Sequence, residues 1–128
     1  MEPWETREWF ADYLDALNRH DFAALRSLID PSVRRAHRPA GVDAWLFELE
    51  ELFDGFPDWR WKRIQLIVEE DRIAAHLRGS GTHTGAFRGI APTRRHVNVA
   101  EFGFYRVVGG RIVEFTAGGD DVVPAISR

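Results

Sequence analysis

The chain contains no cysteine, and this absence excludes several kinds of chemistry. Without thiols there is no disulfide, no thiolate nucleophile and no thiolate-bound metal. Histidine does not replace cysteine as a metal ligand, because no His-x-His or His-x-x-x-His spacing occurs. The glycine-rich stretch GSGTHTG precedes no predicted helix, so it is not a dinucleotide-binding fingerprint. We therefore expect neither a metal site nor a cofactor.

A strong charge of one sign and a long apolar run are also missing. The net charge is −3 over 128 residues and the pI is about 5.9, so no overall field attracts nucleic acid or an anionic membrane. No apolar stretch is long enough to cross a bilayer, and the charged start MEPWETREW lacks the apolar core of a signal peptide. We expect a cytoplasmic protein with no nucleic-acid or membrane partner.

Large aromatic side chains, in contrast, are abundant. The chain has five Trp and nine Phe against one Met, and hydrophobic residues make up 45% of it. This composition is too apolar for disorder and predicts that residues 1–128 form a single domain. The rings either fill the core or line an aromatic cavity, and composition is compatible with both.

The first half of the chain has helical periodicity. Apolar residues at i, i+3 and i+4 spacing predict a helix over 5–19. Asp21 is placed to cap the N-terminus of a second helix, which Asp30-Pro31 ends. A third helix is predicted from about Asp43 to Gly55.

The second half has strand periodicity. Residues 59–68 alternate in polarity, and a change of parity predicts a bulge near Lys62-Arg63. Further strands are predicted over 73–77, 97–108 and 111–117, the last two joined by a Gly-Gly hairpin turn. Helices followed by antiparallel strands predict an α+β domain with its helices packed on one face of a sheet.

Four segments then carry recognisable motifs. They are HRP at His37–Pro39, FPDW at Phe56–Trp59, EEDRIAAHLRGSGTHTGAFRGIAPT at Glu69–Thr93, and GGRIVEF at Gly109–Phe115, the last followed by Asp120. Together they resemble the SnoaL-like polyketide cyclases of the nuclear transport factor 2-like superfamily. The resemblance implies a cone-shaped barrel, in which three N-terminal helices pack on a strongly bent, mostly antiparallel sheet that encloses a pocket.

The resemblance also implies a hydrophobic small-molecule substrate and aldol-type ring closure, or an isomerisation, without metal or Schiff base. In the family an Asp six residues after the Glu of the GRIVE segment is the general acid/base. Counted from Glu114, this spacing leads to Asp120, with Asp121 as the alternative one residue on. A carboxyl group in an apolar pocket has a raised pKa, so one Asp can both remove and return a proton near neutral pH.

The superfamily includes other activities, which remain alternatives. A polyketide hydroxylase of the same fold is one, and a non-catalytic module that binds a small ligand is another. Because the family associates through its sheet, the resemblance further implies a homodimer.

Histidines and aromatic residues supply the other candidate site residues. His83, among glycines that allow close backbone approach, either donates to a developing oxyanion as a catalytic group or only ties its loop. His37 either orients a substrate carbonyl or caps a helix. His76, in mid-strand, is expected to share a buried polar network with Glu101 or Arg106. The expected substrate-binding residues are His37, Tyr13, Trp59, Trp61 and Arg106.

Overall fold

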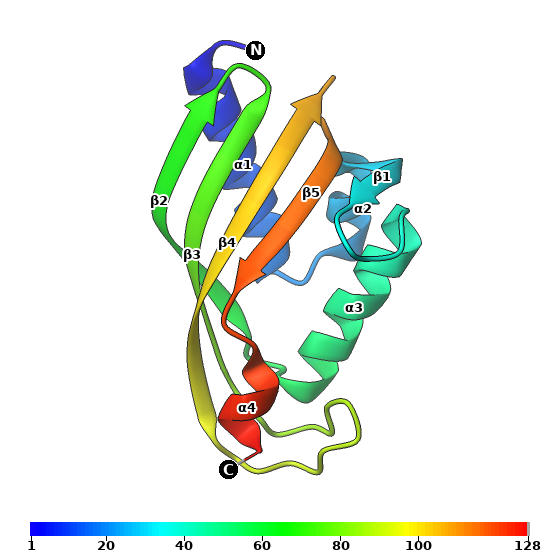
Figure 1. Ribbon diagram of the computed structural model, residues 1–128, viewed down its shortest axis with the longest axis vertical. Coiled ribbons are helices and arrows are strands. Elements are labelled where there is room, and N and C mark those ends of the chain that lie inside the picture. The colour runs from blue at the N-terminus through cyan, green and yellow to red at the C-terminus, as the bar shows by residue number, and fades with distance from the viewer. Residues whose placement is uncertain (128) are drawn as a thin grey trace.

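The computed structural model describes residues 1–127 and contains helices packed against a five-stranded sheet (Figure 1). The helices are α1 (Pro3–Asn18), α2 (Phe22–Leu28), α3 (Val42–Gly55) and α4 (Val122–Ile126). The strands are β1 (Ile29–Arg35), β2 (Arg60–Glu69), β3 (Arg72–Thr82), β4 (His96–Val108) and β5 (Arg111–Gly119). Their order is β1-β5-β4-β3-β2, with β1 parallel to β5 and the other neighbours antiparallel. The fold is therefore α+β with a mixed sheet.

The N-terminal helices form for local reasons. Glu2 and Glu5 make a reciprocal capping box at the start of α1, and Pro3 occupies the first turn, where no N–H is needed. The Asp21 side chain accepts the Ala24 N–H at 3.0 Å and caps α2, which confirms the predicted cap. One stripe of α1 is buried against the sheet and consists of Thr6, Trp9, Phe10, Tyr13, Ala16 and Leu17.

Two elements were not predicted. The Asp30-Pro31 segment does not simply end a helix, because it lies within β1, whose Ile29 and Val33 side chains are fully buried. Proline is tolerated there because β1 is an edge strand, so a missing N–H breaks no ladder bond. The second element is α4, whose N-cap Asp121 accepts the Val123 N–H at 3.0 Å.

Two predicted details of the hairpins are confirmed. The β2–β3 pairing shifts register between Arg63 and Gln65, next to the expected bulge. Gly109 and Gly110 have φ values of 60° and 77°, which only glycine adopts easily, and they form the tight turn between β4 and β5.

The sheet is not strongly curled, and this differs from the cone that the sequence led us to expect. The parallel strand β1 also makes it a mixed sheet. The physical reason lies at its centre, where β3 and β4 pair without a break from Arg72↔Arg106 to Thr82↔His96. Strong local bends require bulges, and this ladder contains none.

The segment between β3 and β4 is held against the end of α3 (Figure 1). The N–H groups of Thr84 and Gly85 both donate to the Gly55 carbonyl oxygen, at 3.1 and 3.0 Å. A Cβ at Gly85 would lie 2.0 Å from the Asp54 carbonyl oxygen. The backbone of this loop therefore approaches the helix end more closely than any side chain permits.

Replacing Gly85 with Ala should destabilise the fold, because the new methyl group overlaps backbone that cannot rotate away. We expect Gly85→Ala to lower the free energy of unfolding by about 1–3 kcal/mol, as overpacking does. The matched control is Gly118→Ala, where a Cβ meets nothing within 4 Å, and its effect should stay within about 0.5 kcal/mol. Urea denaturation measures both, and equal stability of the two variants would contradict the close approach.

Candidate functional site

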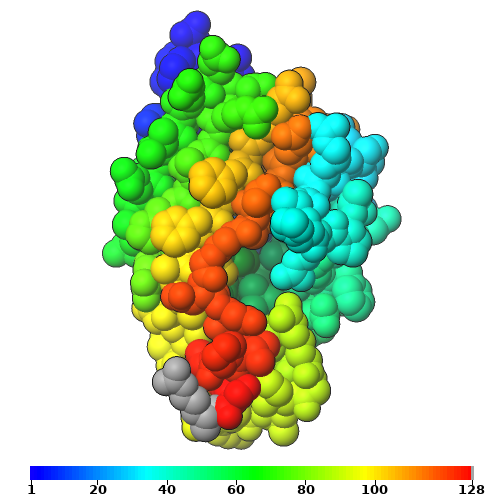
Figure 2. Space-filling model, viewed as in Figure 1, coloured from blue at the N-terminus to red at the C-terminus, as the bar shows by residue number. Residues whose placement is uncertain are grey.

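A cavity of about 420 Å³ lies between the helices and the sheet. Figure 2 shows the surface hollowed between β5 and the segment that joins β1 to α3. The wall is rich in rings, and those of Trp45 and Phe115 stack with centroids 4.4 Å apart. The buried or half-buried aromatic residues of the lining are Tyr13, Trp45, Trp61, Phe87, Tyr105 and Phe115, whereas Phe102 borders the cavity from an outward position of β4 and is 44% exposed. Such a wall suits a flat, apolar molecule.

Two tyrosine hydroxyl groups meet in the inner part of the cavity. Tyr13 comes from α1 and Tyr105 from the inward face of β4, and their hydroxyl oxygens are 3.4 Å apart. Burial raises the pKa of both phenols well above the usual value, and the charge of Glu101 raises both further. Both therefore remain neutral and can donate hydrogen bonds at any physiological pH.

Glu101 is the residue that sequence reasoning underrated, since it was named only as a partner for His76. Its partly buried side chain lines the cavity, and the Trp61 Nε1–H donates to its Oε2 atom. Burial raises the pKa of Glu101, and the bond from Trp61 offsets this only in part. A signal was present, because Glu101 falls at an inward position of a strand that alternates as Val97, Val99, Glu101, Gly103 and Tyr105.

Asp120 and Asp121 lie at the open part of the cavity and are exposed. Asp120 is held against β4, because its N–H donates to the Ala100 carbonyl at 3.0 Å and its Oδ2 accepts the Ala100 N–H at 3.4 Å. Asp121 caps α4. The burial that we expected of the Asp120 carboxyl group is found at Glu101 instead.

An ion pair forms another part of the cavity wall. The Arg35 side chain is 3% exposed, bonds the Pro39 carbonyl oxygen at 2.8 and 3.1 Å, and meets Glu48 at 2.6 Å. Arg38, which is exposed, approaches the same carboxylate at 3.6 Å. These contacts hold β1 and the segment after it against α3.

His83 lies outside the cavity lining, in the loop after β3. Its ring is fully buried and stacks on Phe56 with centroids 5.2 Å apart. The Thr93 N–H donates to Nδ1 at 3.1 Å, so Nδ1 is unprotonated and the proton is on Nε2. The Thr93 hydroxyl is also 2.9 Å from Nδ1. The ring thus joins the two sides of its own loop.

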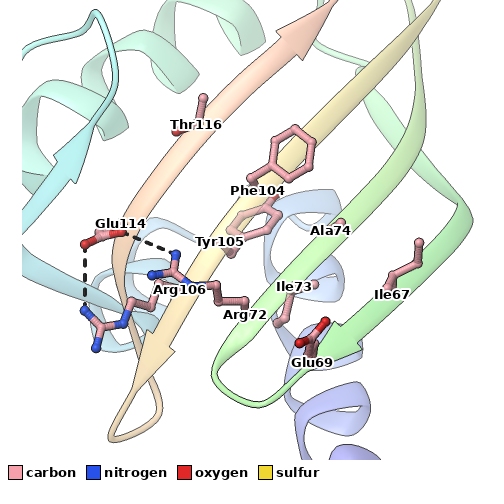
Figure 3. Close-up of a pocket in the computed structure, with 10 residues that line it drawn as sticks. All are labelled: Ile67, Glu69, Arg72, Ile73, Ala74, Phe104, Tyr105, Arg106, Glu114 and Thr116. Carbon is pink, nitrogen blue, oxygen red and sulfur yellow. Dashed lines mark ion pairs between the residues drawn. The ribbon is translucent and has the colours of Figure 1, made fainter.

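The remaining predicted residues are dispersed. Trp61 lines the cavity, whereas Trp59 is fully buried in the core outside the lining. His37 is exposed in the segment after β1. Arg106 lies on the outer face of the sheet, where it pairs with Glu114 at 3.7 Å (Figure 3) and with Asp71 at 2.9 Å.

The buried network expected around His76 does not form. The imidazole ring of His76 stacks on Phe102 with centroids 4.6 Å apart, and Phe102 is 44% exposed. The strand register explains this, because His76 has the opposite parity to the buried Ala75 and Leu77 and so faces away from the core.

Within residues 1–127, no three His, Asp or Glu side chains gather closely enough to hold a metal ion. Over the same range, no helix has the length and apolar character needed to span a membrane.

The family model described as SnoaL-like polyketide cyclase matches residues 8–123. The search among curated proteins found no match to the chain.

Solved structures resemble the chain over nearly its whole length. IdmH from Streptomyces antibioticus, a candidate polyketide cyclase, is 28% identical with a TM-score of 0.78, covering 91% of this chain and 92% of that one. A SnoaL-like polyketide cyclase from Agrobacterium tumefaciens is 27% identical with a TM-score of 0.80, covering 93% and 94%. AclR from Streptomyces galilaeus, a candidate hydroxylase, is 24% identical with a TM-score of 0.85, covering 97% and 94%. The AclR likeness concerns the fold alone.

Removing the His83 ring should cost stability, because Thr93 would lose its buried acceptor and a void would form beside Phe56. We expect His83→Ala to lower the free energy of unfolding by about 1–3 kcal/mol. His96→Ala, at an exposed position, should change it by less than about 0.5 kcal/mol. Thermal and urea unfolding measure both, and a His83→Ala variant as stable as His96→Ala would show that the ring does not tie the loop.

Proposed function

Because the chain belongs to the SnoaL-like polyketide cyclase family, we propose that it is an enzyme acting on a hydrophobic, polyketide-like carbonyl compound, as an aldol-type cyclase or an isomerase. The observation that carries this proposal is the aromatic cavity of about 420 Å³, which has both carboxyl groups and phenols in its lining. Its volume is within the usual range for small-molecule sites. Its stacked Trp45 and Phe115 rings favour a planar, fused-ring substrate.

In the proposed reaction, Asp120 is the base. Its carboxylate removes a proton from a carbon beside a substrate carbonyl, which leaves an enolate. In ring closure the enolate carbon attacks a second carbonyl carbon of the same molecule, a C–C bond forms, and the oxygen of that carbonyl takes up a proton. The two hydrogen bonds to the Ala100 backbone hold Asp120 at the open part of the cavity, and Asp120 belongs to the cavity lining. Asp121, directed to the cap of α4, is the less suited of the two.

Proton removal can be measured without the natural substrate. The probe is 2-tetralone, a fused-ring ketone with acidic C–H bonds, dissolved in D₂O with exchange followed by NMR. We expect the wild-type protein to accelerate exchange, and Asp120→Asn to lower the rate at least about 100-fold, because an amide cannot accept the proton. The near-isosteric change should leave the melting temperature unaltered.

The matched comparison is Asp121→Asn, since Asn also caps helices well and preserves α4. Loss of exchange in Asp121→Asn but not in Asp120→Asn would move the base by one residue. No acceleration by the wild type would contradict the enzyme proposal and favour a module that only binds its ligand.

We also propose that the protein is a homodimer formed through the outer face of the sheet. Exposed apolar side chains gather on this face, and they are Ile67, Phe102 and Phe104 at 44–58% exposure. Beside them the face carries both charge signs, because Glu114 pairs with Arg72 and Arg106 (Figure 3), and also with Arg34. A two-fold axis would bury the apolar groups and set basic groups of one copy against acidic groups of the other.

A charge in the middle of the outer face should prevent association. We expect Phe104→Glu to elute and scatter light as a monomer while the wild type has dimer mass at micromolar concentration. The control is Phe47→Glu, which changes an equally exposed ring on α3 and should remain dimeric. A wild type of monomer mass, or two variants of equal mass, would contradict this interface.

A further inference from the structure

The inward face of β4 places a carboxyl group and a phenol close to each other in the inner part of the cavity. Glu101 and Tyr105 are both inward, with Gly103 between them. A Cβ at Gly103 would lie 2.7 Å from Cε1 and 2.9 Å from the hydroxyl oxygen of Tyr105, so the phenol folds back over Gly103 in the direction of Glu101. The absence of a side chain at Gly103 is what allows the hydroxyl group to approach the carboxyl group.

Only one oxygen of the Glu101 carboxyl group has a hydrogen-bond partner among the described residues. The Trp61 Nε1–H donates to Oε2, and within residues 1–127 no other hydrogen bond and no ion pair to the carboxyl group is found. Among the described residues, only this indole N–H therefore compensates a negative charge on the carboxyl group. The environment accordingly raises the pKa of Glu101 through burial, which favours the neutral acid with an O–H group to donate.

The phenols also retain a free donor. Each hydroxyl group has one hydrogen, and the 3.4 Å contact between Tyr13 and Tyr105 uses only one of the two. One O–H therefore remains to bind an oxygen atom of a ligand. When Glu101 is protonated, the inner part of the cavity therefore offers two neutral donors.

The charged groups that line the cavity leave this arrangement intact. Arg35 and Arg38 are engaged with Glu48. Arg88, Asp120 and Asp121 lie at the open part and are exposed. None of them forms an ion pair with Glu101, although Gly119, the residue before Asp120, is its register partner on β5.

We propose that Glu101 is the proton donor of the site, hydrogen-bonding a substrate carbonyl oxygen together with the free tyrosine hydroxyl and protonating that oxygen as it becomes an alkoxide. This assignment rests on the proposed function. It makes Asp120 the general base and Glu101 the general acid of the same reaction. Asp120 gains the proton from carbon, the new C–C bond uses the enolate electron pair, and the carbonyl π pair moves to oxygen, which takes the Glu101 proton. Solvent then returns a proton to Glu101 and removes one from Asp120, so the cycle balances.

The first test needs no turnover. The probe is 2-acetonaphthone labelled with ¹³C at the carbonyl carbon, whose C=O stretch is recorded by infrared difference spectroscopy with bound protein. We expect a stretch lowered relative to hexane, and a downshift that weakens as rising pH ionises Glu101. Glu101→Gln, which keeps a donor that cannot ionise, should retain a downshift that no longer depends on pH. Glu101→Leu should lose most of the downshift.

Folding of the variants is checked by the pH dependence of their stability, which also tests the acid form. A native carboxyl group with a raised pKa holds its proton longer than in the unfolded chain, so it costs stability as pH rises. The free energy of unfolding of the wild type should thus fall, relative to Glu101→Gln, from the ordinary glutamate pKa of about 4.3 up to the raised value. For Glu50→Gln, at an exposed position, the free energy of unfolding should vary with pH in the same way as that of the wild type.

Turnover separates the two proposals. In the 2-tetralone assay, Glu101 transfers its proton to the ketone oxygen as the C–H bond breaks. The Gln amide can hydrogen-bond that oxygen but cannot protonate it, so Glu101→Gln should lower the exchange rate at least about 100-fold while Glu50→Gln keeps it. Normal exchange in Glu101→Gln, or a wild-type downshift that does not vary with pH, would overturn the assignment of Glu101 and leave the proposed function standing. A pH-dependent downshift without any exchange would sustain the Glu101 site and contradict the proposed function.

Discussion

The unbroken ladder between β3 and β4 is the constraint on which the rest of the molecule depends. Because side chains alternate along a strand, this pairing divides the residues of β4 strictly between two faces. Glu101, Gly103 and Tyr105 face the cavity, whereas Phe102 and Phe104 face outward. A slip of one residue would place the carboxyl group in solvent and the phenyl rings in the cavity. The register thus assigns both the candidate chemistry and the candidate dimer surface.

The polar groups of the cavity gain their properties from the apolar groups around them. Tyr13 reaches Tyr105 because α1 buries its aromatic stripe against the sheet, with Phe10 packed on both tyrosine rings at 5.5 and 5.6 Å. Glu101 is partly buried in the same cavity, and this burial raises its pKa. Asp120, one residue beyond the register partner of Glu101, is exposed at the open part of the cavity. Two carboxyl groups in unlike surroundings are suited to opposite roles in proton transfer.

Local features were predicted well because neighbouring residues determine them. The Asp21 cap, the Gly109-Gly110 turn and the bulge near Arg63 each depend on a few adjacent residues. The strand β1 was missed because Asp30-Pro31 is read locally as a break, and only an edge position beside β5 makes Pro31 acceptable. His83 likewise owes its surroundings to Phe56 and Thr93, with which it shares no local pattern.

The sequence by itself determined the α+β class and the family, because periodicity, caps and motif spacing are properties of the chain read in order. Only the tertiary structure decided which of the acids Glu101 and Asp120 is partly buried. Glu101 lines a cavity to which Trp61 from β2 and Tyr13 from α1 also contribute, and these residues are distant from it in sequence. The tertiary structure also decided that Arg106 and His76 face outward and that Trp59 belongs to the core. The burial of a side chain depends on the packing of the helices against the sheet, so it is not determined by the order of residues in one segment.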